Sequence, residues 1–69
     1  MQNLIENYIN GNLSTAKGLA KRVSYAKIMI TLHDYGYSTE AALAITAFLK
    51  GMGSFQAACD AEHADKTII

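Results

Sequence analysis

Two side chains with reactive or metal-binding groups, Cys59 and His63, stand four positions apart near the end of the chain. Residues at this spacing share one face of a helix, so the thiol and the imidazole would lie close together. With His33 they could supply zinc ligands, or they could form a thiolate–imidazole pair. Zinc sites need four ligands, and the paired-cysteine spacing of structural zinc sites is absent. We therefore expect Cys59 to pack as a small apolar residue, and we expect no metal and no cofactor.

The other groups that could support catalysis are poorly arranged. Asp60 and Glu62 would point in different directions on a helix. The glycines of GMG at 51–53 precede a helix but follow no strand, so they do not match a dinucleotide-binding loop. A core built from 69 residues also leaves little room for a substrate pocket of roughly several hundred Å³. We expect no enzymatic activity, and a metal-dependent or cysteine enzyme is the least favoured hypothesis.

The strongest candidate for a binding surface is a basic segment. Segment 13–35 resembles parts of a helix-turn-helix: a helix of small residues, a new start at Ser24, and a second helix with outward basic and aromatic groups. Lysines there could hold phosphates, with Tyr25 nearer the bases. The usual three- to four-residue turn between the two helices is missing from the pattern, and an ordinary solvated lysine face is the alternative interpretation. The candidate interaction surface comprises Lys17, Lys21, Arg22, Tyr25 and Lys27.

Composition limits the partners and the compartment. The net charge is zero, with six basic and six acidic residues, which argues against a general nucleic-acid coat protein. A single cysteine excludes a disulfide within the chain and fits a reducing compartment. The first ten residues lack the basic start and the long apolar core of a signal peptide, and the most apolar window, Ala41 to Leu49, is too short for a membrane span. We therefore expect a cytoplasmic protein without a membrane segment.

The hydrophobic pattern predicts helices throughout. No segment shows sustained alternation with a period of two, and serine and glycine residues separate segments with helical periodicity. The expected helices cover 3–10, 13–23, 25–35, about 38–50 and 55–64, or four helices if the second and third merge. The sequence thus predicts an all-α fold: one compact domain over 1–64, followed by a C-terminal tail at 65–69. Ile68 and Ile69 in that tail either pack back onto the domain or meet a partner.

The stretch STEAALAITAFLKG at 38–51 is the expected centre of the fold. A helix that is apolar on nearly every face needs neighbours on several sides. A chain this short buries only about 60% of its unfolded surface, so we favour a homodimer, with a monomer enclosed by its own helices as the alternative. The predicted structural core comprises Leu32, Leu43, Ile45, Phe48, Leu49 and Phe55.

Five short stretches that together span most of the chain carry a resemblance. They are YINGNL at 8–13, AK at 16–17, LAKR at 19–22, FLKG at 48–51 and SFQAACD at 54–60. This pattern is similar to small helical accessory proteins encoded in the early region of lambda-like enterobacterial temperate phages and prophages. The resemblance implies a small protein of the host cell cytoplasm that modulates host physiology or the lysis–lysogeny decision. It transfers no site residues.

Two function hypotheses follow. The first is a non-enzymatic phage accessory protein that acts by binding an unknown host or phage protein. The alternative is a small DNA-binding transcriptional regulator that uses the helix-turn-helix-like segment at 13–35.

Overall fold

Five α-helices account for most of the chain in the computed structural model, which describes residues 2–67 and the side chains of residues 2–65. The helices are α1 (Gln2–Ile9), α2 (Leu13–Ala20), α3 (Tyr25–Asp34), α4 (Thr39–Leu49) and α5 (Phe55–Thr67). No strand occurs within residues 2–67, so the predicted all-α class is confirmed. The helices form one small domain with a Cα radius of gyration of 10.8 Å.

Serine side chains begin three of the helices, as the sequence predicts. Each hydroxyl accepts a hydrogen bond from a backbone N–H three residues further on, which satisfies one of the unpaired donors at a helix start. These serines are Ser24, Ser38 and Ser54, with donor–acceptor distances of 3.2, 3.1 and 3.1 Å. Asn12 stands before α2 but makes no side-chain cap, and its amide instead donates to the side chain of Asn7.

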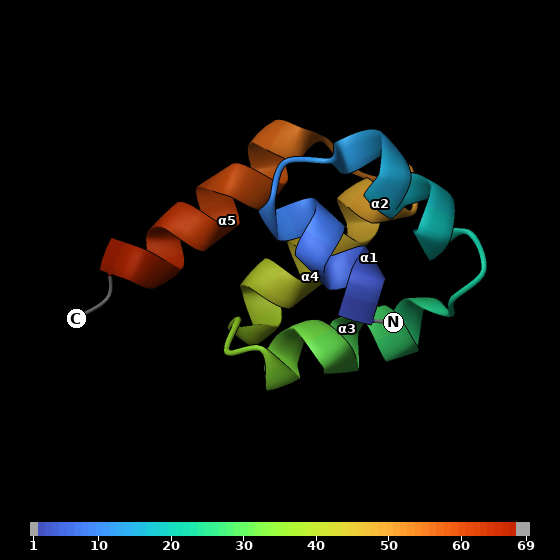
Figure 1. Ribbon diagram of the computed structural model, residues 1–69. Coiled ribbons are helices and arrows are strands. Elements are labelled where there is room, and N and C mark those ends of the chain that lie inside the picture. The colour runs from blue at the N-terminus through green and yellow to red at the C-terminus, as the bar shows by residue number, and fades with distance from the viewer. Residues whose placement is uncertain (1, 68–69) are drawn as a thin grey trace.

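The apolar helix α4 is the centre of the packing. It contacts α3 and α5 along its length and touches α2, while α1 packs mainly on α2 (Figure 1). Its only polar buried side chain, Thr46, donates a 2.6 Å hydrogen bond to the carbonyl of Ala42 one turn earlier, so no polar group is left without a partner. The prediction of a central apolar helix is confirmed. The buried residues of α4 are Ala41, Ala42, Ile45, Thr46, Phe48 and Leu49.

The other helices contribute small sets of buried side chains to this core. α1 supplies Leu4, Ile5 and Tyr8, α2 supplies Ala16 and Ala20, α3 supplies Ile28 and Leu32, and α5 supplies Ala58. The alanines of α2 permit close approach to its neighbours, because they place no bulk between the helix backbones.

The prediction of the core is wrong for two of its six residues, Leu43 and Phe55. Leu43 is 47% exposed and Phe55 is 43% exposed, whereas Leu32, Ile45, Phe48 and Leu49 are buried. Leu43 lies on the more exposed side of α4. Phe55 is the first residue of α5, where its ring packs on Phe48 at a centroid distance of 5.2 Å but keeps one face in solvent.

The helix boundaries differ from the prediction in two places. α2 ends at Ala20 rather than near Val23, and it does not merge with α3. α5 continues to Thr67, so the predicted tail begins inside a helix. The isoleucines at 68 and 69, which were expected to pack back or meet a partner, lie outside the described residues. Within the part of the chain that is described, no helix has both the length and the hydropathy to cross a bilayer.

Lys50, just after α4, connects that helix to the end of α2. Its ammonium group donates hydrogen bonds to the carbonyl oxygens of Ala20, at 2.8 Å, and of Val23. Carbonyls at a helix C-terminus lack partners within the helix and carry a partial negative charge, so a lysine there is stabilising. The positive charge of Lys50 therefore compensates the partial negative charge at the C-terminal end of α2, and Lys50 also stands at the C-terminal end of α4.

Candidate functional site

The predicted basic surface lies at the end of α2 and the beginning of α3. Lys21 and Arg22 are in the connection between these helices, and Lys27 is in the first turn of α3; all three are exposed. Lys17 is also exposed, and its ammonium lies 4.9 Å from the centre of the Phe48 ring, a cation–π contact. The segment thus presents several positive charges to solvent near one another in sequence.

The predicted helix-turn-helix geometry is not formed. The connection at 21–24 has the four-residue length that the pattern was expected to lack, so that detail of the prediction is wrong. However, α2 packs on α1 and α4, whereas α3 packs on α4. Figure 1 shows α2 and α3 on opposite sides of the domain. The two helices therefore do not make the packed pair that places a recognition helix in the major groove.

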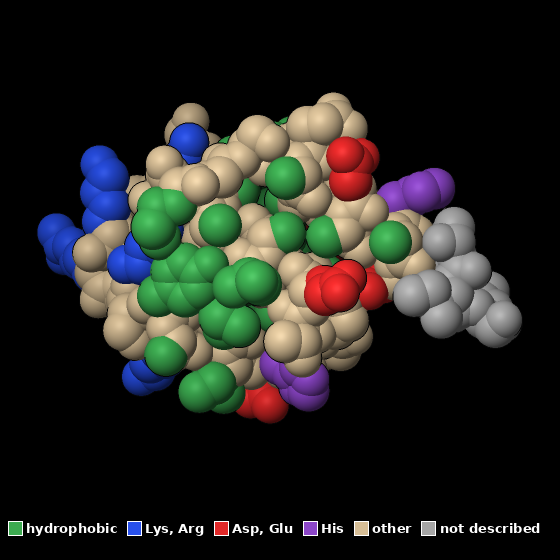
Figure 2. Space-filling view, turned by 180° about the vertical axis from the view of Figure 1, so that it is seen from behind, with side chains coloured by type: hydrophobic (Ala, Val, Ile, Leu, Met, Phe, Trp, Pro, Cys, Tyr) green, Lys and Arg blue, Asp and Glu red, His purple; other side chains and the backbone are tan. Residues whose placement is uncertain are grey.

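Tyr25 belongs to a different surface, at the junction of α3 and α4. Its hydroxyl donates a 3.2 Å hydrogen bond to the carbonyl of Leu43, which places its ring beside that exposed leucine. Met29 and the 62%-exposed Ile30 line a shallow hollow at the same junction, together with His33, Thr39 and Ala42. We call Tyr25, Met29, Ile30 and Leu43 the α3–α4 face. Figure 2 shows hydrophobic side chains gathered on this side of the molecule, with basic side chains along one edge.

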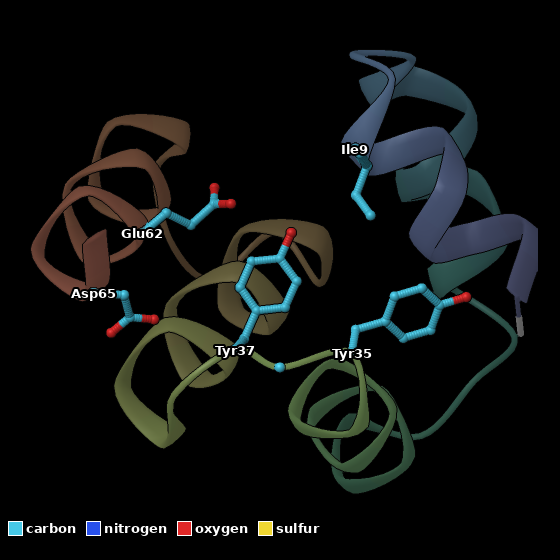
Figure 3. A pocket seen from close by; sticks show the side chains of 6 residues that line it. Ile9, Tyr35, Tyr37, Glu62 and Asp65 are labelled. Carbon is cyan, nitrogen blue, oxygen red and sulfur yellow. The ribbon is translucent and has the colours of Figure 1, made fainter.

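A pocket of about 330 Å³ lies on another side, between α1, the turn after α3, and α5. Figure 3 shows the side chains that surround it, with Ile9 from α1, two tyrosines from the turn and two carboxylates from α5. We call this the tyrosine–carboxylate pocket. Its lining residues are Ile9, Tyr35, Gly36, Tyr37, Glu62 and Asp65. A second hollow of about 380 Å³ adjoins it and shares Ile9, Tyr37 and Glu62.

Glu62 is the polar centre of this pocket. Its Oε2 accepts a 2.7 Å hydrogen bond from the hydroxyl of Tyr8, which is otherwise buried. Burial raises the pKa of Tyr8 far above its ordinary value of 10.0, and the hydrogen bond and the negative charge of Glu62 raise it further. Burial, followed by the charge and hydrogen bonding of Glu62, also raises the pKa of Tyr37. Both phenols therefore stay protonated at neutral pH and can donate to the carboxylate.

Asp65 connects the other side of the pocket to the start of α4. Its Oδ2 accepts a 3.2 Å hydrogen bond from the backbone N–H of Ser38. Gly36, between the two tyrosines, has φ of 104°, a conformation that permits the sharp turn after α3 and that other residues rarely adopt. Two polar contacts and one glycine therefore shape a pocket whose side chains come from three separate parts of the chain.

The sequence did not reveal this pocket. The small core was expected to leave little room for a pocket of several hundred Å³, but hollows of about 330 and 380 Å³ lie at the surface where α1 and α5 flank the turn after α3. Glu62 appeared only as half of a rejected catalytic pair. The one available signal was the pair of tyrosines around Gly36, since binding residues are found disproportionately on loops.

Cys59 and the two histidines do not come together as a set of three metal ligands. Cys59 is half-buried with a free thiol, while His33 and His63 are exposed on different helices. Among the residues whose positions are described, no three His, Cys, Asp or Glu side chains are grouped so that they could hold a metal ion.

Comparison of the sequence with protein-family models, with curated proteins and with solved structures finds no match in any of the three.

Proposed function

We propose that this protein is a non-enzymatic accessory protein of a temperate phage or prophage that acts in the host cytoplasm by binding another protein. The observation that carries this proposal is the α3–α4 face. Ile30 and Leu43 are large apolar side chains with about half or more of their surface in contact with water. Grouped apolar side chains on a small protein favour burial against a partner.

The surroundings of this face fit a protein interface. Protein interfaces commonly have an apolar centre with aromatic residues and methionine, and a polar rim. Here the partly exposed Tyr25 and Met29 supply an aromatic residue and a methionine, while Lys27 is exposed on the same helix. Basic residues at the rim would favour encounter with an acidic partner and fix its orientation.

An affinity capture from host lysate tests this proposal, with the bound proteins identified by mass spectrometry. The wild-type chain is compared with Ile30→Ser and Leu43→Ser, and with Met52→Ser as a matched control. Met52 is 66% exposed but lies in the connection between α4 and α5, away from the α3–α4 face. We expect a captured protein that the first two variants lose and the control retains. Equal capture by all four proteins would show that this face is not the binding surface.

DNA binding remains a second candidate, because Lys17, Lys21, Arg22 and Lys27 are all exposed. Without the helix-turn-helix geometry, such binding would rest on phosphate contacts and would weaken steeply with salt. A gel-shift titration at two salt concentrations tests it, and Lys21→Glu should then weaken the shift. The absence of a shift at low salt would end this hypothesis.

The proposed homodimer is tested by light scattering. A second copy could cover the α3–α4 face in the same way as another partner. A molecular mass near that of one chain, 7.5 kDa, at high protein concentration would exclude the dimer.

A further inference from the structure

We propose that the tyrosine–carboxylate pocket binds the guanidinium group of an arginine side chain presented by a partner polypeptide. This site is separate from the α3–α4 face, and its test does not depend on that surface. Three features of the pocket support the proposal: its charge, its aromatic walls and its size.

The pocket carries negative charge, and its carboxylate oxygens can accept further hydrogen bonds. None of the described residues that line it is basic, whereas Glu62 and Asp65 are both carboxylates. A carboxylate offers about four lone-pair positions. Tyr8 takes one of these on Glu62, and the backbone of Ser38 takes one on Asp65. Each carboxylate can therefore still accept hydrogen bonds from a cation that enters the pocket.

The contact with Tyr8 also fixes the position of the Glu62 carboxylate. The hydroxyl of Tyr8 donates a 2.7 Å hydrogen bond to this group, which restrains the direction of its side chain. In Figure 3 the Glu62 side chain extends from α5 toward the hydroxyl end of Tyr37. The anion is thus positioned before any ligand arrives, which reduces the ordering cost of binding.

The aromatic and aliphatic walls favour guanidinium over a compact ammonium group. Tyr35 is 44% exposed and Tyr37 is half-buried, so parts of both rings are accessible to a ligand. A guanidinium is planar and weakly hydrated, and it stacks on aromatic rings while its fork donates to carboxylates. The 53%-exposed side chain of Ile9 supplies an apolar contact for the methylene stem of arginine.

The size and opening of the pocket favour a side chain on a polypeptide over a large free ligand. A volume of about 330 Å³ is at the lower end of the range for small-molecule sites, roughly 300–1,000 Å³. The pocket is partly open to solvent, so a single side chain can enter while the chain that carries it stays outside.

An NMR titration of the full chain with small probes tests the proposal. The probe is N-acetyl-arginine-N-methylamide, and the matched control probe is the citrulline analogue, which has nearly the same shape but no charge. We expect saturable shifts of the backbone amides of Gly36, Glu62 and neighbouring residues with the arginine probe, and at least about tenfold weaker binding of the citrulline probe. Equal binding of the two probes, or no saturable shift with the arginine probe, would overturn the proposal.

Three variants locate the site. Glu62→Gln should weaken binding of the arginine probe about tenfold. Because this change also affects the contact with Tyr8, Tyr35→Ser serves as a second variant that leaves the carboxylate and its hydrogen bonds intact, and it should weaken binding several-fold. Asp60→Asn is the control: it removes the same charge from the same helix, but outside the pocket. Unchanged binding by Tyr35→Ser, or equal losses in Glu62→Gln and Asp60→Asn, would show that the pocket is not the binding site.

A lysine probe tests the preference for the planar cation. N-acetyl-lysine-N-methylamide carries the same charge on a compact ammonium group, so we expect it to bind more weakly than the arginine probe. Equal affinity for the two would overturn the assignment to guanidinium.

Discussion

Replacing Lys50 by methionine should destabilise the protein more than any other change of a single charge outside the pocket. The ammonium of Lys50 donates to two backbone carbonyls, those of Ala20 and Val23, at the C-terminal end of α2. Methionine keeps the length and the apolar stem of the side chain but removes the donors. The carbonyl of Ala20 would keep its 3.2 Å hydrogen bond from the backbone N–H of Val23, whereas the carbonyl of Val23 would lose the lysine donor, and α2 would lose its attachment to the end of α4.

The size of the effect follows from these contacts. A hydrogen bond to a charged group contributes about 1.5–3 kcal/mol, and the interaction of a cation with a helix C-terminus adds about 0.3–1 kcal/mol. Because Lys50 is half-buried and loses side-chain entropy on folding, we expect a net loss of about 2–3 kcal/mol for the pair of bonds. A domain of 69 residues has a free energy of unfolding of roughly 3–10 kcal/mol. The midpoint of thermal unfolding should therefore fall by roughly 10–20 °C.

Thermal and urea unfolding followed by far-ultraviolet circular dichroism would measure this loss. Lys27→Met is the matched control, because Lys27 is exposed in the first turn of α3, where a positive charge is slightly unfavourable. It should change the free energy of unfolding by less than about 0.5 kcal/mol. If Lys50→Met costs no more than this control, the bonds to α2 do not stabilise the fold and the reasoning is refuted.

Three further predictions concern the core, the backbone and the pH dependence of stability. Ile45→Ala should cost about 2–5 kcal/mol in urea unfolding because Ile45 is fully buried, whereas Leu43→Ala should cost less than about 1 kcal/mol. Equal losses would contradict the observed orientation of α4. Gly18→Ala should stabilise the protein by up to about 1 kcal/mol, because a Cβ in this helix meets no atom within 4 Å. Gly11→Ala should instead destabilise the protein by about 1–2 kcal/mol, because φ of Gly11 is 85°, a conformation that alanine rarely adopts. If thermal unfolding shows the Gly11 variant to be more stable than the Gly18 variant, both predictions are refuted. The raised pKa of Tyr8 means that its contribution is complete below the ordinary pKa of 10.0 and declines as the pH rises above it. Urea unfolding at increasing alkaline pH should therefore show a smaller pH dependence for Tyr8→Phe than for the wild type, and identical slopes would contradict the assignment.

Local signals were sufficient to predict the helices. A serine that can accept from the N–H three residues later, and a glycine that can adopt a left-handed conformation, act within a few residues, so both can be recognised in the sequence. Ser24, Ser38 and Ser54 begin helices for this reason. The end of α5 was less predictable, because no glycine follows Ala64 and the helix simply continues.

The orientation of α4 could not be predicted in the same way. Its residues are apolar on nearly every side, so periodicity does not distinguish Leu43 from Ile45. The buried side of α4 depends on where the other helices pack against it, and their packing leaves Leu43 about half exposed. The tyrosine–carboxylate pocket was missed for a related reason, since Ile9, Tyr37 and Glu62 are brought together only when α1 and α5 have both packed.

The polar residues of this protein divide into those that hold helices together and those that are available to a partner. Lys50 joins α4 to α2, and the contact of Tyr8 with Glu62 joins α1 to α5. Such contacts matter in a chain this short, because among the described side chains α5 adds one fully buried residue to the core, the small Ala58. Lys50 therefore cannot be part of a recognition surface without weakening the fold, whereas Lys21 and Arg22 carry no such role among the described contacts. Glu62 belongs to both groups of polar residues. Its hydrogen bond with Tyr8 holds α5 against α1, and the same contact directs its carboxylate into the tyrosine–carboxylate pocket. A ligand bound there would stabilise the packing of α5 on α1, so binding and stability are expected to be coupled at this position.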